Sequence, residues 1–173
     1  MARKKYCKPG DVFTVPLGDG RVGIGQVAAG YAPMSAYYMT IFDVVTREED
    51  APSDVAAALA APVLFASLSY DGKIYAGHWR IIDHAPVSRT TRLPAYRVAI
   101  GAPPRPYIED FFAIKRRRAS RKEARALPER GFVSPAVLER ALRAHHGMEP
   151  WLPAFDDLAL NQLAIADRFA TDA

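Results

Sequence analysis

Residues 115–125 contain seven basic residues and one acidic residue, the strongest concentration of one charge in the chain. Arginine and lysine at this density can bind nucleic-acid phosphates, an anionic membrane or the carboxylates of an acidic protein. They can equally form a solvated helix face with no ligand. Six of them are candidate partner-binding residues: Arg116, Arg117, Arg118, Arg121, Lys122 and Arg125. If this segment is the interface, reversing Arg117, Arg118 and Arg121 to glutamate weakens partner binding and its salt dependence.

The rest of the chain has the opposite charge. The whole protein has 23 basic and 19 acidic residues, and its first eight residues contain four of the basic ones. Outside those eight residues and residues 115–125, 12 basic residues face 18 acidic ones. The sequence therefore predicts an acidic body that carries two local basic patches.

Three glycines, Gly18, Gly20 and Gly23, match the spacing of a dinucleotide-binding fingerprint. That fingerprint binds pyrophosphate only between a parallel strand and the N-terminus of a helix. Here a strand pattern follows, Gly23-Ile-Gly25-Gln-Val27, so the glycines indicate a hairpin. We assign no cofactor and no cofactor-binding residue.

Residues typical of metal or nucleophilic chemistry are scattered. His145 and His146 are adjacent on a predicted helix, so their side chains diverge by about 100° and do not share a metal as an i, i+4 pair would. Cys7 is the only cysteine, and no C-x-x-C, H-E-x-x-H or G-x-S-x-G sequence is present. We assign no metal ligand and no catalytic residue. A small enzyme of unknown reaction remains a third alternative, which a pocket formed by Tyr75, His78 and a carboxylate would favour.

The two tryptophans, Trp79 and Trp151, are further candidate partner-binding residues because tryptophan is enriched at interface hot spots. Core packing is the competing interpretation. Near-complete burial in the free chain would argue against a place in the interface.

The first half of the chain is predicted to form a sheet, since alternating and β-branched segments are separated by turn residues. The expected strands are residues 12–17, 22–28, 37–45, 62–70, 73–82 and 96–100. Asp19-Gly20 and Asp71-Gly72 predict tight hairpin turns, and Ser53-Asp54 begins a short helix over residues 54–61. Tyr37 or Tyr38, if exposed on this sheet, could stack nucleic-acid bases.

The second half is predicted to be helical. Ser120 and Glu123 form a capping box for a helix that ends before Pro128. Ser134-Pro135 begins a second helix, which Gly147 ends. Its buried stripe is Val137, Leu138, Ala141 and Leu142, and Asp156-Asp157 begin a last helix.

Length and composition favour one folded domain. The chain has 173 residues, of which 50% are hydrophobic and 24% charged. Its longest apolar stretch, residues 55–66, is too short to span a bilayer. The single cysteine and the lack of a signal-peptide pattern lead us to expect a cytoplasmic protein. We expect one α+β domain over residues 1–173: a bent, mostly antiparallel β-sheet or partial barrel with short helices toward the C-terminus. Residues 1–8 and 165–173 are expected to be poorly ordered.

Several short segments, taken in order along the chain, are more informative together than alone. The first is Lys8-Pro-Gly-Asp-Val-Phe13 with the following Gly23-x-Gly25-Gln-Val27. A middle group is Asp71-Gly-Lys73 and Gly77-His-Trp-Arg-Ile-Ile82. The C-terminal group includes Val133-Ser-Pro135 and the ending His145-His146-Gly147. Together these segments resemble the immunity protein 26 family over residues 8–160, and the middle group is similar to the hairpin of that family.

The resemblance implies an immunity protein of a bacterial polymorphic toxin system, which binds a toxin encoded nearby and so protects the producing cell. It implies a protein-binding module in the cytoplasm, without catalytic residues. The charge pattern leaves the binding face open, because the acidic body suits a basic nuclease and the arginines suit an acidic toxin. A nucleic-acid-binding module that uses residues 115–125 is the second alternative.

Overall fold

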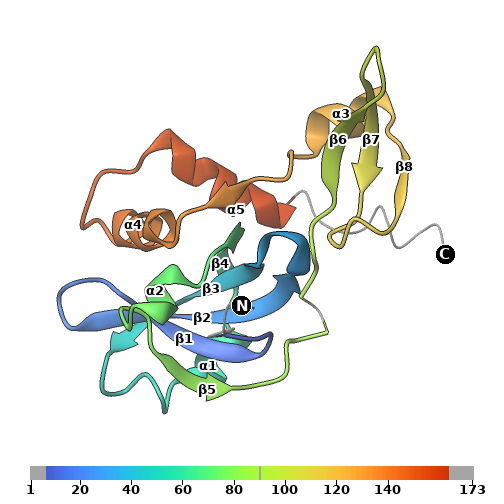
Figure 1. The fold of residues 1–173 in the computed structure, drawn as a ribbon. Helices are drawn as coiled ribbons and strands as arrows, with labels where there is room; N and C mark the ends of the chain where they lie inside the picture. The colour runs from blue at the N-terminus through green and yellow to red at the C-terminus, as the bar shows by residue number, and fades with distance from the viewer. Residues whose placement is uncertain (1–6, 90, 164–173) are drawn as a thin grey trace.

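Two β-sheets form the framework of this protein, whose structure, a computed structural model, describes residues 7–89 and 91–163 (Figure 1). The larger sheet has, in spatial order, β5 (Ile81–His84), β1 (Asp11–Pro16), β2 (Arg21–Tyr31), β3 (Ala36–Arg47), β4 (Val63–Ser69) and β9 (Phe132–Val133). The smaller sheet has β6 (Tyr96–Ile100), β7 (Arg105–Glu109) and β8 (Arg116–Arg118). Only the pairing of β4 with β9 is parallel among these strands. The predicted α+β class with a mostly antiparallel sheet is confirmed.

Short helices complete the fold, and the longest of those described lie toward the C-terminus. They are α1 (Val55–Ala60), α2 (Gly72–Tyr75), α3 (Arg121–Ala126), α4 (Pro135–His145) and α5 (Asp156–Leu163), with 3-10 turns η1 (Ala32–Met34) and η2 (Pro153–Phe155). Figure 1 shows α4 and α5 on one side of the large sheet. No helix in the described part of the chain is long and apolar enough to cross a membrane.

The main core lies between β1–β4 and α4. Leu138, Ala141 and Leu142 of α4 are fully buried there, and Val137 packs at the margin, so the predicted stripe is confirmed. Two glycines of β2 allow this close packing. A Cβ at Gly23 would lie 2.5 Å from Leu142 Cδ2, and one at Gly25 would lie 2.7 Å from the Phe13 ring. Neither position has room for a side chain unless its neighbour moves.

Local signals predicted most elements correctly. The hairpin at residues 18–20 joins β1 to β2, and β3 and β6 lie where expected. The capping box of α3 and the Ser134 cap of α4 are both formed. Gly147 has a φ of 71°, as a helix-ending glycine does. At α1 the helix forms, but the Asp54 side chain accepts a hydrogen bond from Thr46 instead of capping the helix.

The second predicted hairpin, at Asp71-Gly72, is wrong. Tyr75 N donates to Asp71 O at 2.7 Å and so closes the helical turn of α2. The chain then crosses to the far edge of the sheet, where β5 pairs with β1 instead of with β4. Trp79, on this crossing, has its ring buried against Phe13, and burial of so large an apolar ring outweighs the local hairpin preference. The free edge of β4 pairs with β9.

Most residues expected to be poorly ordered, 1–6 and 165–173, lie outside the described residues. Two residues of the expected N-terminal segment are described. Cys7 is 3% exposed and belongs to the main core, and Lys8 N donates to Asp11 Oδ2 at 2.9 Å. The acidic side chain of Asp11 thus fixes the entry into β1.

Candidate partner-binding surface

Residues 96–130 form a lobe beside the large sheet, made of β6, β7, β8 and α3 (Figure 1). This basic lobe contains ten basic and four acidic residues. Ile108 and Leu127 are buried in a small core of their own. The two ends of the lobe lie side by side, since Arg97 N donates to Pro128 O at 2.8 Å and Arg97 Nη2 contacts Glu129 at 2.8 Å. The lobe is therefore an insertion between two strands of the large sheet, β5 and β9.

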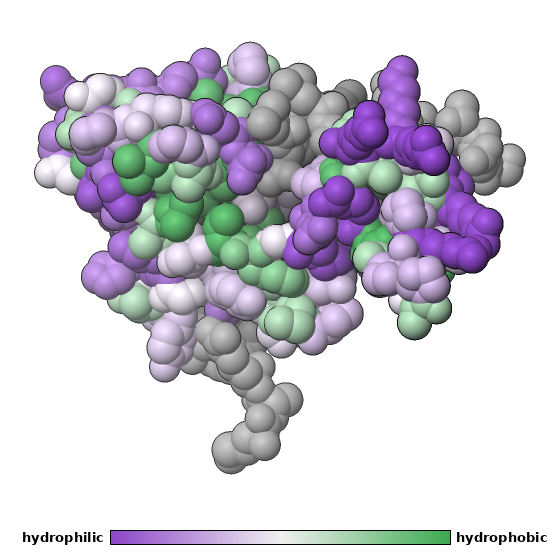
Figure 2. All heavy atoms as spheres, turned by 90° about the horizontal axis from the view of Figure 1, so that it is seen from above, coloured by the Kyte–Doolittle hydropathy of each residue, from purple (hydrophilic) through white to green (hydrophobic). Residues whose placement is uncertain are grey.

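All three glutamates of the basic lobe are paired with arginines inside it. Glu109 binds Arg116 and Arg130, Glu123 binds Arg117, and Glu129 binds Arg97. The exposed cations of the lobe that form no ion pair among the described residues are Arg105, Lys115, Arg118, Arg121, Lys122 and Arg125. Figure 2 shows hydrophilic side chains gathered over this part of the molecule.

The five arginines and one lysine that were predicted to bind a partner therefore divide into two groups. Arg116 and Arg117 hold the lobe together through their glutamate partners. The other four are exposed and unpaired among the described residues: Arg118, Arg121, Lys122 and Arg125. Only these four keep a charge that a ligand can neutralise.

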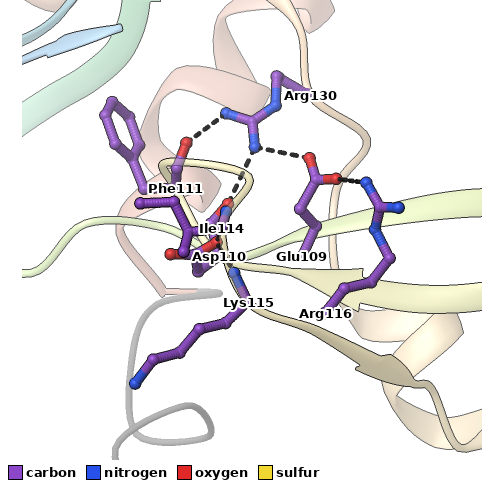
Figure 3. Close-up of polar contacts among 7 residues, drawn as sticks. All are labelled: Glu109, Asp110, Phe111, Ile114, Lys115, Arg116 and Arg130. Carbon is purple, nitrogen blue, oxygen red and sulfur yellow. Dashed lines mark hydrogen bonds and ion pairs between the residues drawn. The ribbon is translucent and has the colours of Figure 1, made fainter.

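Arg130 connects the exit of the lobe to the loop between β7 and β8 (Figure 3). Its side chain is only 10% exposed. One guanidinium nitrogen donates to Phe111 O at 2.8 Å, and the other donates to Asp110 O and Glu109 Oε1 at 3.0 Å each. Burial acts to raise the pKa of Glu109, but Arg116 and Arg130 outweigh it, so this pKa lies below its ordinary value. Glu109 is therefore held as the charged partner of both arginines.

The same guanidinium lies between two tyrosine rings. It is 4.5 Å from the ring centroid of Tyr31, on β2, and 4.2 Å from that of Tyr96, on β6. Phe111 packs edge-on against Tyr31 and Tyr38, at centroid distances of 5.9 and 5.6 Å. These contacts attach the basic lobe to the large sheet, and the residues that make them have structural roles.

Base stacking by Tyr37 or Tyr38 is a hypothesis that the structure contradicts. Their side chains are 6% and 1% exposed, because β3 is a central strand with both faces covered. Burial also raises the pKa of Tyr38, as expected for a phenol away from water. Neither ring is available to a ligand.

Glu123, the acidic residue of the α3 capping box, has a lowered pKa. Hydrogen bonds from the Arg117 guanidinium, and next from Ser120, lower the pKa of Glu123 to about 2. Ser120 N donates to Glu123 Oε2 at 2.9 Å, and Glu123 N donates to Ser120 Oγ at 3.2 Å. The capping box and the ion pair thus share one carboxylate.

Glu123→Gln is expected to lower stability by about 0.5–1 kcal/mol at neutral pH, because the neutral amide keeps the capping hydrogen bonds but loses the ion pair with Arg117. A folded-state pKa below the ordinary 4.5 contributes stability that is present above pH 4.5 and is lost as the pH falls toward about 2. Urea unfolding of both proteins should therefore show a difference that shrinks over that range. A difference independent of pH would contradict this role for the carboxylate.

The two candidate tryptophans lie in different environments. Trp79 is 1% exposed, is stacked on Phe13 with centroids 5.2 Å apart, and donates from Nε1 to Glu139 Oε2 at 3.1 Å. It is a core residue, not a surface residue of the free chain. Trp151 is 43% exposed and donates from Nε1 to Asp156 Oδ1 at 2.8 Å. Of the two, only Trp151 can contact a partner without rearrangement.

A loop that the sequence analysis did not single out presents apolar side chains to solvent. Residues 110–115 connect β7 to β8, and there Phe111 is buried while Phe112 is 49% and Ile114 81% exposed. The signal in the sequence is the run Phe-Phe-Ala-Ile between Asp110 and Lys115. Such a run is equally typical of a buried strand, so its exposure emerges only from the fold.

Tyr75 and His78, the two residues named above for an enzyme pocket, both lie on the surface. Tyr75 is 59% exposed on α2, and His78 is exposed in the turn after it. Among residues 7–89 and 91–163, no group of three or more histidine, cysteine, aspartate or glutamate side chains is placed to hold a metal ion.

Comparison with models of known families gives a match. A family model described as Immunity protein 26 matches residues 8–105, which include β1–β6 and end at the first residue of β7. Most of the basic lobe and all of α4 and α5 lie beyond the matched range. No curated protein and no solved structure matches the chain.

Proposed function

This chain belongs to the immunity protein 26 family, and from that premise we propose that it binds and neutralises a cognate bacterial toxin. The family match over more than half of the sequence is the observation that carries the proposal. The toxin is encoded by a neighbouring gene, and both proteins meet in the cytoplasm of the producing cell. Neutralisation occurs by stoichiometric binding. This mode of inhibition needs no catalytic residue in this chain.

The direct test is protection from the toxin encoded next to this gene. A strain that lacks both genes is expected to grow with the toxin domain only when this chain is co-expressed. The two purified proteins should elute as a defined complex on size-exclusion chromatography. Growth arrest despite co-expression, with no complex in vitro, would refute the proposal.

We place the toxin-binding face on the basic lobe, at Arg118, Arg121, Lys122 and Arg125. The support is electrostatic, since these exposed cations have no internal partner while the glutamates around them do. The body of the protein is less suited, because several of its exposed acids are already paired. Asp19 binds Arg21 and Glu48 binds Arg80. The toxin surface expected opposite the lobe is acidic.

Single reversals Arg118→Glu, Arg121→Glu and Arg125→Glu should each weaken toxin binding by about 3- to 30-fold and flatten its dependence on salt. Binding is measured by titration calorimetry at two salt concentrations. The matched control is Arg47→Glu, the same charge change at an exposed arginine on β3 that forms no ion pair among the described residues. Arg117 is left unchanged because its reversal would also break the pair with Glu123.

The control decides how the result is interpreted. If Arg47→Glu weakens binding as much as the lobe variants, the effect is one of net charge and the lobe is not the interface. If no variant changes the affinity or the salt dependence, the arginines are solvated and the binding face lies elsewhere.

Nucleic-acid binding remains the second candidate, favoured by the same unpaired cations. A single-stranded RNA and a DNA duplex, both fluorescently labelled, test it by anisotropy. Phosphate binding would give an affinity that falls steeply with salt, with a slope that decreases by about one for each lost contact. A tight complex with the toxin that persists after nuclease treatment would argue against it.

A further inference from the structure

We propose that the loop of residues 110–115, the anchor loop, is the apolar centre of the toxin interface and inserts Phe112 and Ile114 into an apolar pocket on an acidic face of the toxin. The inference rests on the proposed function and deepens it. It adds to the cations of the lobe a site of different chemistry and states what the partner must present.

The first argument is exposure. Ile114 is 81% exposed and Phe112 is 49% exposed, and they are separated by a single residue. Exposure of large apolar side chains to water is unfavourable, and burial against a partner would remove this cost. The aromatic neighbour Phe111 is buried under the same loop and needs no such partner.

The second argument is that the loop is held in one conformation while its apolar side chains remain outside. Asp110 Oδ1 accepts hydrogen bonds from the backbone nitrogens of Ile114 and Lys115, at 2.7 and 2.8 Å. Asp110 N donates in turn to Lys115 O at 3.0 Å. Arg130 fixes the other side of the loop through the carbonyls of Asp110 and Phe111 (Figure 3).

Such a fixed loop reduces the entropy that association must overcome. Ala113, between the two exposed side chains, has a φ of 60°, in the left-handed region that residues other than glycine rarely adopt. The internal hydrogen bonds of the loop therefore maintain a conformation that is locally unfavourable, and its result is the outward presentation of Phe112 and Ile114. We interpret this as a prepared contact rather than as an incidental exposure.

The third argument is the charge around the loop. Lys115 follows Ile114 directly and is exposed, and Arg118 is exposed at the far end of β8, the strand that follows the loop. Neither forms an ion pair among the described residues. An apolar loop followed by exposed cations on the adjoining strand fits a protein pocket edged by carboxylates, because hot spots usually lie inside a polar rim.

The test uses the full chain and the toxin domain encoded by the neighbouring gene. Phe112→Ala and Ile114→Ala are each expected to weaken binding by about tenfold or more, mainly through faster dissociation. The matched control is Ile81→Ala, at an isoleucine that is 41% exposed on β5, at the edge of the large sheet. Surface plasmon resonance gives both rates, and thermal unfolding confirms that each variant is folded.

The outcomes separate this inference from the proposed function. If the unmodified chain does not bind the toxin, the proposed function fails. If it binds and the loop variants bind equally well, only the anchor loop is refuted. Equal weakening by Ile81→Ala would also overturn it.

Other occupants of the loop are tested with the same variants. Dimerisation of the unmodified chain on size-exclusion chromatography, abolished by Ile114→Ala, would assign the loop to a second copy. Binding to phosphatidylserine vesicles that is lost in the same variant would assign it to a lipid surface. Either result would overturn the inference.

Discussion

Replacing Arg130 with alanine is expected to lower the free energy of unfolding by about 3–5 kcal/mol, the usual cost of removing one partner from a buried ion pair. The side chain is 10% exposed and donates to Glu109 and to the carbonyls of Asp110 and Phe111. Its loss leaves the two carbonyls without this donor and leaves Glu109 with Arg116 as its remaining arginine partner. It also removes the cation between Tyr31 and Tyr96.

Arg130→Lys should recover little of this stability, because an ammonium group does not reproduce the planar fork that reaches three acceptors. Urea unfolding measures the change, and hydrogen exchange shows where it acts. The backbone amides of residues 105–118 should lose protection first. A loss below about 1 kcal/mol, with an unchanged exchange pattern, would show that Arg130 is not the link between lobe and sheet.

Trp79→Ala is the second large effect, with an expected loss of about 3–5 kcal/mol. The indole is fully buried, is stacked on Phe13 and donates to Glu139. Truncation leaves a cavity between β1 and α4 and removes one donor from a carboxylate that also binds Lys73 and Arg143. Trp79→Phe should lose less, about 1–2 kcal/mol, because a smaller aromatic ring remains on Phe13 while the N–H and part of the indole volume are lost.

Trp151→Ala is the comparison variant, since its indole is 43% exposed. We expect a stability loss of about 1 kcal/mol, from reduced packing on Phe65 and Phe155. Chemical denaturation of both variants separates core from surface. Equal losses for Trp79→Ala and Trp151→Ala would contradict the assignment of Trp79 to the core.

The elements that were predictable are those whose signal is local. The Asp19-Gly20 turn specifies a hairpin without help from the rest of the chain, and Ser120 and Ser134 specify helix starts in the same way. The side of α4 that carries Leu138 and Leu142 follows from its period alone.

The hairpin prediction at Asp71-Gly72 was wrong because the local sequence is ambiguous and a contact between residues far apart in sequence determines the structure there. The dipeptide is compatible with a hairpin turn and with the first residues of a helix. What decides between them is the ring of Trp79, which packs against Phe13 more than sixty residues away in sequence. The residues near position 71 in the sequence do not reveal this contact.

The sequence predicts that the candidate site is rich in arginine, but it does not predict which arginines form internal ion pairs. The density of arginine in residues 115–125 is visible in the sequence, but Arg116 and Arg118 are indistinguishable there. Strand register separates them, because Arg116 lies opposite Glu109 and Arg118 lies opposite Tyr107. The anchor loop was missed for the same reason, since the fold alone decides that Phe111 is buried and Ile114 is exposed.

The adjacent ends of the basic lobe have an evolutionary consequence. The chain leaves the large sheet after β5 and returns to it at β9, and the bridge between Arg97 and Glu129 holds the outgoing and returning segments together. A recombination event between these two points would exchange the whole lobe without shifting the strand register of the scaffold. The newcomer would need an aromatic side chain in place of Phe111 and a cation in place of Arg130 to keep the contacts with Tyr31 and Tyr38. Under the proposed function, such an architecture would let toxin specificity change by exchange of the whole lobe, while the large sheet stays the same.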